Sequence, residues 1–329
     1  MINPKVFLNS KLFDPDIEQK PSRNGYGEGL VLAGEENEQV VALCADLTES
    51  TRTQSFAEKF PQRFFEIGVA EQNLATVAAG MALAGKIPFI TSYATFSPGR
   101  NWEQIRTTIC YNNVPVKIIG SHAGISVGPD GATHQALEDM AIMRTLPNMM
   151  VICPADSIES RKATLALAKT GKPGYMRLSR DKVPVITTNE TPFEIGKAEV
   201  YKEGKDVAVI ACGQMVYRAL QAAHELELHK ISVRVINCHT IKPLDKKTIL
   251  KAAEECKAIV TVEEHQITGG LGGAVAEVLS ENFPVPLKII GIEDRFGESG
   301  EPNELLEKFG LTKEAIVKAI TQVLRMKEK

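Results

Sequence analysis

Glu71 is the carboxylate whose position in this sequence points most clearly to chemistry. The apolar and aromatic run 63–67 predicts a buried strand, and a helix of small residues is expected to start near Glu71 and to run to Ala84. In an open α/β sheet, the turn from a strand into a helix borders the crevice in which ligands bind. Acidic residues are also common in a first helical turn, where they offset the helix dipole. The local sequence therefore leaves both a functional and a capping role open for Glu71.

The loop 121–135, SHAGISVGPDGATHQ, is the second stretch that could do chemistry. It follows a predicted strand and places His122, Asp130 and His134 in a glycine-rich connection at the crevice side of the sheet. These side chains could bind a polar ligand, or they could serve only as loop and capping residues. His134 and Glu138 would lie one helical turn apart, but no third metal ligand has suitable spacing. We therefore predict no metal site in this chain.

The elements that position these residues alternate regularly along the sequence. Buried strands such as 39–45 (QVVALCA) alternate with helices, among them one that Ser22 would cap and one over 136–145. This alternation with short connections predicts an α/β fold with a parallel, doubly wound sheet. The segment 183–196 contains two prolines and no helical period, which predicts an interdomain linker. A second, smaller α/β domain is expected in 197–329, and residues 1–21 are expected to form an arm that gains order only by docking.

Composition excludes several classes of protein. The chain has 329 residues, a net charge of −3 and a pI near 6.1, so it carries no basic excess for nucleic acid or an anionic membrane. No stretch approaches the length of a membrane span, and we expect a cytoplasmic protein. The six cysteines form no CxxC pair and are predicted to be small buried apolar residues in a reducing compartment. The glycine cluster 268–275 lacks nucleotide-binding spacing and predicts a closely packed helix start.

The sequence as a whole resembles the C-terminal half of transketolase and of its relatives that use thiamine diphosphate. The resemblance is carried by long, ordered segments spread over nearly all of the chain. These segments are IGVAEQNLATVAAGMALAG (67–85), TSYATF (91–96), SHAGISVGPDGATHQALEDMAIMRTLPNM (121–149), YMRLSR (175–180) and RFGESG (295–300). The resemblance implies a pyrimidine-binding domain over 22–182 and a transketolase C-terminal domain over 197–329.

The resemblance also implies roles for residues around the cofactor. Glu71 would hydrogen-bond a ring nitrogen of the aminopyrimidine and favour its imino tautomer, and Tyr93 and Phe96 would pack on the ring. Where transketolases have a further stacking aromatic residue three positions after Phe96, this chain has Gly99. Phe96 is therefore the first choice for stacking on the ring, and the roles of Arg100 and Trp102 stay open.

The substrate side follows from the same resemblance. The matching positions would clamp a sugar phosphate with two guanidinium groups, a hydroxyl and an imidazole, and would contact sugar hydroxyls with two further side chains. The phosphate set is Arg23, Ser50, His122 and Arg180, and the hydroxyl set is Asp130 and His134, with His134 also assigned to catalysis beside Glu71. An exposed arginine taken alone is more often solvated than functional.

One motif of thiamine enzymes is missing. They hold Mg²⁺ and the cofactor's diphosphate with a GDG…N motif, whereas the only similar run here is PDG at 129–131. We therefore expect a separate N-terminal subunit that carries GDG…N and holds the diphosphate and the metal. The expected assembly contains two copies of each chain.

Together these observations favour the C-terminal subunit of a split transketolase. It would transfer a two-carbon ketol unit between ketose and aldose phosphates, as in the pentose phosphate pathway. Enzymatic alternatives are a subunit similar to 1-deoxy-D-xylulose-5-phosphate synthase and a beta subunit of the two-oxoacid dehydrogenase type. A noncatalytic partner that merely stabilises the other half is the alternative from another class.

Overall fold

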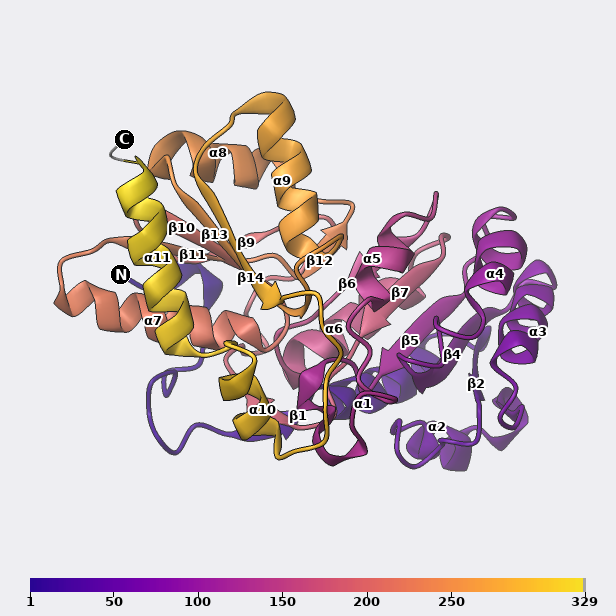
Figure 1. The fold of residues 1–329 in the computed structure, drawn as a ribbon. Helices are drawn as coiled ribbons and strands as arrows, with labels where there is room; N and C mark the ends of the chain where they lie inside the picture. The colour runs from indigo at the N-terminus through magenta and orange to yellow at the C-terminus, as the bar shows by residue number, and fades with distance from the viewer. Residues whose placement is uncertain (328–329) are drawn as a thin grey trace.

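A seven-stranded sheet forms the centre of the N-terminal half in the computed structural model, which describes residues 1–327 (Figure 1). Its strand order is β12-β6-β7-β5-β4-β2-β3, and all neighbours run parallel except β12, which pairs antiparallel with β6. The strands are β2 (Val40–Cys44), β3 (Phe64–Glu66), β4 (Ile87–Tyr93), β5 (Lys117–Ser121), β6 (Met150–Ile152), β7 (Gly174–Arg177) and β12 (Thr240–Lys242). The predicted parallel α/β fold is thus confirmed.

Helices cover both faces of this sheet because its central strands are apolar on both sides. In β2, for example, Val41 and Leu43 pack in one core cluster with α3, whereas Val40 and Ala42 pack in another with α1 and α6. The first face carries α3 (Glu71–Leu83), α4 (Trp102–Gln104), the π-helix η3 (Ile105–Cys110) and α5 (Asp139–Arg144). The second face carries α1 (Ser22–Glu36), α2 (Gln54–Lys59) and α6 (Ser157–Ala168).

The C-terminal half forms a five-stranded sheet of order β14-β13-β10-β11-β9, parallel except for β9 at its edge. Its strands are β9 (Glu199–Lys202), β10 (Val207–Ala211), β11 (Val233–Asn237), β13 (Ile259–Gln266) and β14 (Leu287–Ile292). Its helices are α7 (Met215–Leu228), α8 (Lys246–Cys256), α9 (Leu271–Asn282), α10 (Pro302–Lys308) and α11 (Lys313–Lys327). This half matches the smaller second series of strands and helices that the sequence predicts.

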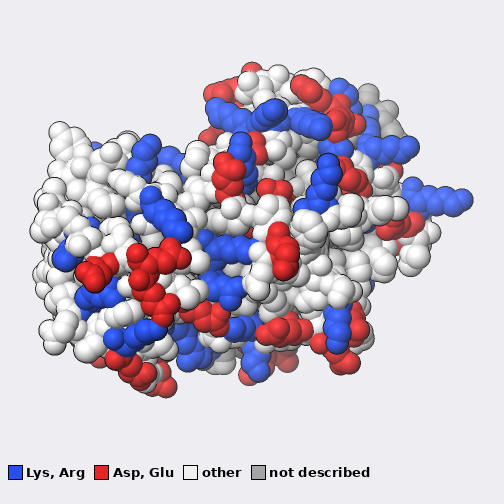
Figure 2. Space-filling model, turned by 180° about the vertical axis from the view of Figure 1, so that it is seen from behind, with Lys and Arg blue, Asp and Glu red and all other residues white. Residues whose placement is uncertain are grey.

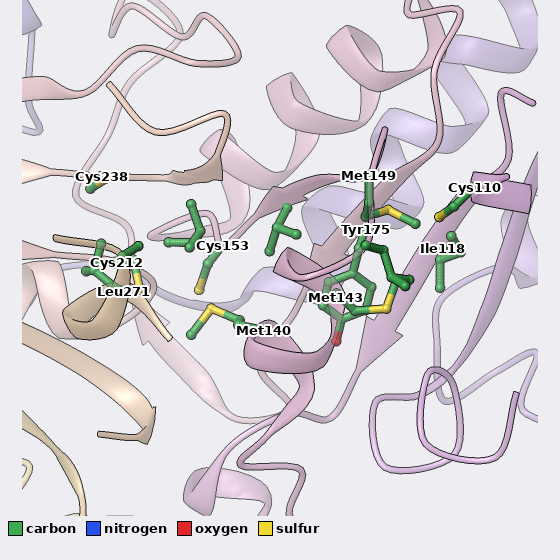
Figure 3. Close-up of a cluster of buried hydrophobic side chains, with 14 of the residues drawn as sticks. Cys110, Ile118, Met140, Met143, Met149, Cys153, Tyr175, Cys212, Cys238 and Leu271 are labelled. Atoms are coloured by element: carbon green, nitrogen blue, oxygen red, sulfur yellow. The ribbon is translucent and has the colours of Figure 1, made fainter. Parts of the chain in front are cut away.

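The two halves share one hydrophobic core. Figure 3 shows Met140 of α5 and Cys153 facing Cys212 and Leu271 of the C-terminal half. Beside this core, Arg177 donates to Asp139 at 3.0 Å and to the carbonyl oxygen of Glu264 at 2.7 Å. These buried contacts fix the position of the second half against the carboxyl edge of the first sheet. All six cysteines are buried and free, as predicted.

Residues 1–21 lie against the C-terminal half. The short strand β1 (Gln19–Pro21) pairs with β8 (Lys182–Pro184), and Val6, Leu12 and Ile17 are buried in the core around α7. The predicted arm is therefore docked, while its boundary, the linker 183–196 and the two domain ranges stay predictions. No helix among the described residues is both long and apolar enough to span a membrane.

Three local predictions were wrong, and two strands were not predicted. The run 63–67 forms an edge strand, β3, whose residues are half-buried or exposed. The hydroxyl of Ser22 does not cap α1, because it is bonded to Ser179. The helix expected from residue 136 begins only at Asp139, so His134 and Glu138 do not share a helical turn. The strands β9 and β12 were not foreseen.

The start of α9 shows why the glycine cluster 268–275 is needed. The amides of Leu271 and Gly272 donate to the buried carboxylate of Glu263, each at 2.7 Å. A Cβ on Gly272 would lie 2.5 Å from the side chain of Ile289. The predicted close-packed helix start is confirmed, and its free amides bind an anion supplied by the chain itself.

Candidate active site

The carboxyl edge of the seven-stranded sheet gathers most of the predicted site residues. Tyr93 ends β4, His122 follows β5 and Arg180 follows β7, and these strands are parallel neighbours. Glu71 begins α3 after β3, and Arg23 lies in the first turn of α1. Because parallel strands end at a common edge, side chains far apart in sequence meet there.

Glu71 is a buried carboxylate that is paired with an arginine. Its side chain is 3% exposed, and both carboxylate oxygens accept hydrogen bonds from Nη1 of Arg100, at 3.0 and 3.1 Å. The amide of Asn101 donates to the Glu71 carbonyl oxygen at 3.0 Å. The Arg100 guanidinium also lies 4.0 Å from the centre of the Phe96 ring, while 49% of the Arg100 side chain is exposed. Glu71 and Phe96 therefore both contact one planar, half-exposed group.

Aromatic and imidazole rings continue from Phe96 towards the other end of the site. The Phe96 ring lies 6.0 Å from Tyr93 and 5.4 Å, edge to face, from His134. Tyr93 in turn stacks on His122, with ring centres 3.9 Å apart and planes inclined by 24°. The predicted cofactor residues and the predicted substrate residues are thus in direct contact.

His122 is a neutral imidazole held in a left-handed backbone conformation, with φ of 55°. Arg23 Nη1 donates to His122 Nε2 at 2.7 Å, so Nε2 accepts and the ring proton lies on Nδ1, 2.9 Å from the Ser121 hydroxyl. Burial, and then the charge of Arg23, lowers the pKa of His122 to about 2. An uncommon backbone conformation of this kind is often found at functional sites.

A pocket with a volume of about 500 Å³ lies beyond His122. Its basic lining residues are Arg23, Arg52, Arg180 and Lys182, and its acidic lining residues are Asp181 and Glu301. Burial, and then the charges of Arg52 and Arg180, lower the pKa of Arg23. Within the described part of the chain, Nε of Arg23 is buried without a hydrogen-bond partner. This concentration of positive charge and the unpaired donor are suited to an anion.

Two of the predicted substrate residues make fewer side-chain contacts within the site than expected. Ser50 meets Arg23 through its carbonyl oxygen, at 3.0 Å, rather than through its hydroxyl. Asp130, at the end of the 3₁₀ helix η4 (Ile125–Asp130), is exposed, and its side chain makes no hydrogen bond to any described residue. Neither observation tests a contact with substrate, so both assignments stay predictions.

Sequence reasoning missed Arg52 and gave no role to Arg100. Arg52 lies two residues after Ser50 in the segment that follows β2, so its place at the same sheet edge could have been noticed. Arg100 follows Phe96 by four residues, and the amide of Arg100 donates to the Phe96 carbonyl oxygen at 2.8 Å. That helix-like spacing is the available signal that the two side chains can meet. Among residues 1–327, no cluster of three or more His, Cys, Asp or Glu side chains could hold a metal ion.

Comparison with known families agrees with this architecture. Residues 18–185 match the family model of the transketolase pyrimidine-binding domain, and residues 196–316 match that of the transketolase C-terminal domain. The chain belongs to the transketolase family, whose members depend on thiamine diphosphate.

Individual relatives match over nearly their whole length. A Methanocaldococcus jannaschii chain, named provisionally as a transketolase C-terminal section, is 46% identical over 93% of this chain and 97% of its own length. A 6-deoxy-6-sulfo-D-fructose transketolase subunit from a Clostridium species is 40% identical over 96% of this chain and 98% of its own length. A solved structure described as an inactive β4 tetramer of a split-gene transketolase is 47% identical, with a TM-score of 0.88 over 93% of this chain and 99% of that chain.

Proposed function

We propose that this chain is the C-terminal subunit of a split transketolase. With thiamine diphosphate and an N-terminal partner, it would transfer a two-carbon ketol unit between ketose and aldose phosphates. The observation that carries the proposal is the continuous series of contacts from Glu71 through Arg100, Phe96, Tyr93 and His122 to Arg23. A slot for a planar, nitrogen-bearing group lies at one end of this series, and a positively charged pocket lies at the other.

The residues at the first end fit the aminopyrimidine of the cofactor. Glu71 is a buried acceptor, and one face of Phe96 already contacts a planar group that donates N–H bonds to Glu71. When bound, thiamine diphosphate supplies the carbon nucleophile that attacks the ketose carbonyl. Glu71 would accept or share a proton at a ring nitrogen, and Phe96 would hold the plane of the ring. Tyr93 would support Phe96 from the side of His122.

The residues at the second end would bind the substrate. Arg23 and Arg180 would contact the phosphate with charge-assisted hydrogen bonds, and the neutral imidazole of His122 would contact it beside Arg23 without exchanging a proton. His134, edge-on to Phe96, lies between the two ends, where sugar hydroxyls near the reacting carbons would pass. We assign Asp130 to a more distant hydroxyl and Ser50 to the phosphate. The four basic residues that line the pocket suit the near-dianionic charge of a phosphate at neutral pH.

The diphosphate and Mg²⁺ would be held by the partner, since this sequence contains no GDG…N motif. The outer face of α3, directly after Glu71, carries no charged side chain, and we propose it as part of the partner interface. Its exposed residues are Gln72, Asn73, Thr76, Gly80 and Leu83. Figure 2 shows few charged groups at the end of the molecule where α3 and α4 lie. We expect two copies of each chain in the active enzyme.

The enzymatic alternatives differ in what they require. A 1-deoxy-D-xylulose-5-phosphate synthase normally carries both halves in one chain, and a two-oxoacid dehydrogenase beta subunit need not bind a sugar phosphate. The basic pocket at Arg23 and Arg180 therefore favours transketolase over the second alternative. A noncatalytic partner would have no need for the buried Glu71 at a crevice, which supports an enzyme.

Glu71→Gln in the reconstituted pair tests the proposal. The amide keeps the side chain's shape but cannot take up the proton, so turnover should fall by about 10²- to 10⁴-fold. Glu103→Gln is the matched control, because Glu103 is an exposed carboxylate in the first turn of α4. Thermal unfolding of both variants would show whether they are folded. Turnover of Glu71→Gln equal to that of the control would refute the assignment.

A further inference from the structure

We propose that Arg100 occupies the aminopyrimidine position in the chain on its own and competes with the cofactor for it. The inference rests on the proposed function, because it concerns the same slot. Nη1 of Arg100 donates to both oxygens of Glu71, at 3.0 and 3.1 Å, and the guanidinium stacks 4.0 Å from the centre of the Phe96 ring. A planar group with N–H donors thus makes the contacts that the proposed function assigns to the aminopyrimidine.

One slot cannot hold both groups. A ring that stacks on the same face of Phe96 would need the volume that the guanidinium fills at van der Waals distance. Hydrogen bonding of the ring to Glu71 would likewise replace the bonds from Arg100. Cofactor binding by this subunit therefore requires the Arg100 side chain to move out.

The pairing has a physical reason in the separate subunit. The Glu71 side chain is 3% exposed, and a carboxylate so deeply buried is strongly destabilising unless a donor or a positive charge accompanies it. Arg100 provides both. Its stacking on Phe96 adds a cation–π contact that a lysine's point-like ammonium could not reproduce with the same planar geometry.

Arg100 is also free to leave. About half of its side chain, 49%, is exposed, and the hydrogen bonds of its guanidinium to other described residues go to Glu71. Its backbone is held by the turn, through the bond to the Phe96 carbonyl oxygen, and the neighbouring Asn101 side chain is anchored to Glu71 and Ser97. A rotation of the side chain alone would open the slot without unfolding the turn.

Two measurements with Arg100→Gln test the inference. The first is the dissociation constant of thiamine diphosphate with Mg²⁺ in the reconstituted pair, by calorimetry. Without the competing guanidinium, the variant should bind about three- to tenfold more tightly, a modest gain because half of the Arg100 side chain is already exposed to solvent. Arg100→Lys should lie between the variant and the wild type. Arg325→Gln, which removes an exposed charge on α11, should leave the constant unchanged.

The second measurement concerns the chain alone, with unfolding followed by the fluorescence of Trp102, its single tryptophan. Arg100→Gln should lower the melting temperature when Glu71 is present, because it leaves a buried carboxylate unpaired. The same change should have little effect in the Glu71→Gln background. Equal losses in both backgrounds would show that Arg100 does not act through Glu71 and would overturn the inference.

The two proposals fail in distinguishable ways. If the wild-type pair binds no thiamine diphosphate, the proposed function fails and this inference fails with it. If wild type and Arg100→Gln bind with the same constant, or the variant binds more weakly, the proposed function stands and the competition by Arg100 is refuted.

Discussion

Arg180→Ala should selectively weaken the binding of phosphorylated sugars. Arg180 lies just after β7, lines the basic pocket with Arg23, and is oriented by a hydrogen bond from its Nη1 to the Val127 carbonyl oxygen at 2.6 Å. Alanine removes the guanidinium but leaves Arg23 and His122 in place. Phosphate binding should therefore be weakened rather than abolished.

The size of the effect follows from one lost charge-assisted hydrogen-bonding group. Such a contact contributes roughly 1.5–3 kcal/mol, which corresponds to about a 10- to 150-fold rise in KM for a phosphorylated ketose. The assay is steady-state ketol transfer by the reconstituted pair. Hydroxypyruvate with an unphosphorylated acceptor is the comparison reaction, and its KM should change less than about twofold.

Arg325→Ala serves as the control variant for the loss of an exposed arginine, and it should leave both reactions unchanged. Equal losses by Arg180→Ala with phosphorylated and unphosphorylated substrates would refute the phosphate clamp. That result would indicate that Arg180 contributes to folding or subunit assembly instead.

Three further predictions concern neighbouring groups. His134→Ala should slow ketol transfer with phosphorylated and unphosphorylated donors alike, since its proposed contacts are to hydroxyls near the reacting carbons. In the same kinetic assay, an effect confined to phosphorylated donors would contradict this role. His122, whose pKa burial lowers to about 2, is neutral when folded but takes up a proton when unfolded below about pH 6.5, so acid favours the unfolded chain. Urea titrations from pH 6.5 to 4.5 measure this effect on the free energy of unfolding. That free energy should fall more steeply in wild type than in His122→Asn, by up to about 1.4 kcal/mol per pH unit. Identical slopes for the two proteins would disprove the protonation argument. Arg177→Met should cost about 3–5 kcal/mol of unfolding free energy, because the buried Asp139 loses its opposite charge and keeps the Tyr175 hydroxyl as a donor. Adding Asp139→Asn should restore part of the loss, and a loss below about 1 kcal/mol in urea titration would count against a buried pair.

Much of the fold could be predicted because its signals are local. Apolar runs such as Val40–Cys44 are long enough to specify strands, and Asp156 and Asp245 cap the helices that follow them, as their types suggest. The three-residue strand β12 could not be predicted, because it pairs with β6 of the other half and has no pattern of its own. The strand β3 was expected, but its exposure was not, because that exposure depends on its place at the sheet edge.

The candidate site shows a similar division. The positions of Tyr93, His122 and Arg180 at one sheet edge follow from parallel strands, so the sequence predicts that they converge. The pairing of Arg100 with Glu71 could not be predicted, since it depends on the conformation of the turn 94–101 and on the burial of Glu71. Spacing alone also could not show that Ser50 would meet Arg23 through its backbone.

The central claim is that this chain supplies one half of an active site. The most direct test is ketol transfer by the purified chain with saturating thiamine diphosphate and Mg²⁺, measured without and with an N-terminal subunit that carries GDG…N. We predict no activity for the chain alone, and activity together with a cofactor-dependent rise in melting temperature for the mixture. Cofactor-dependent ketol transfer by this chain alone, free of any companion, would contradict the claim.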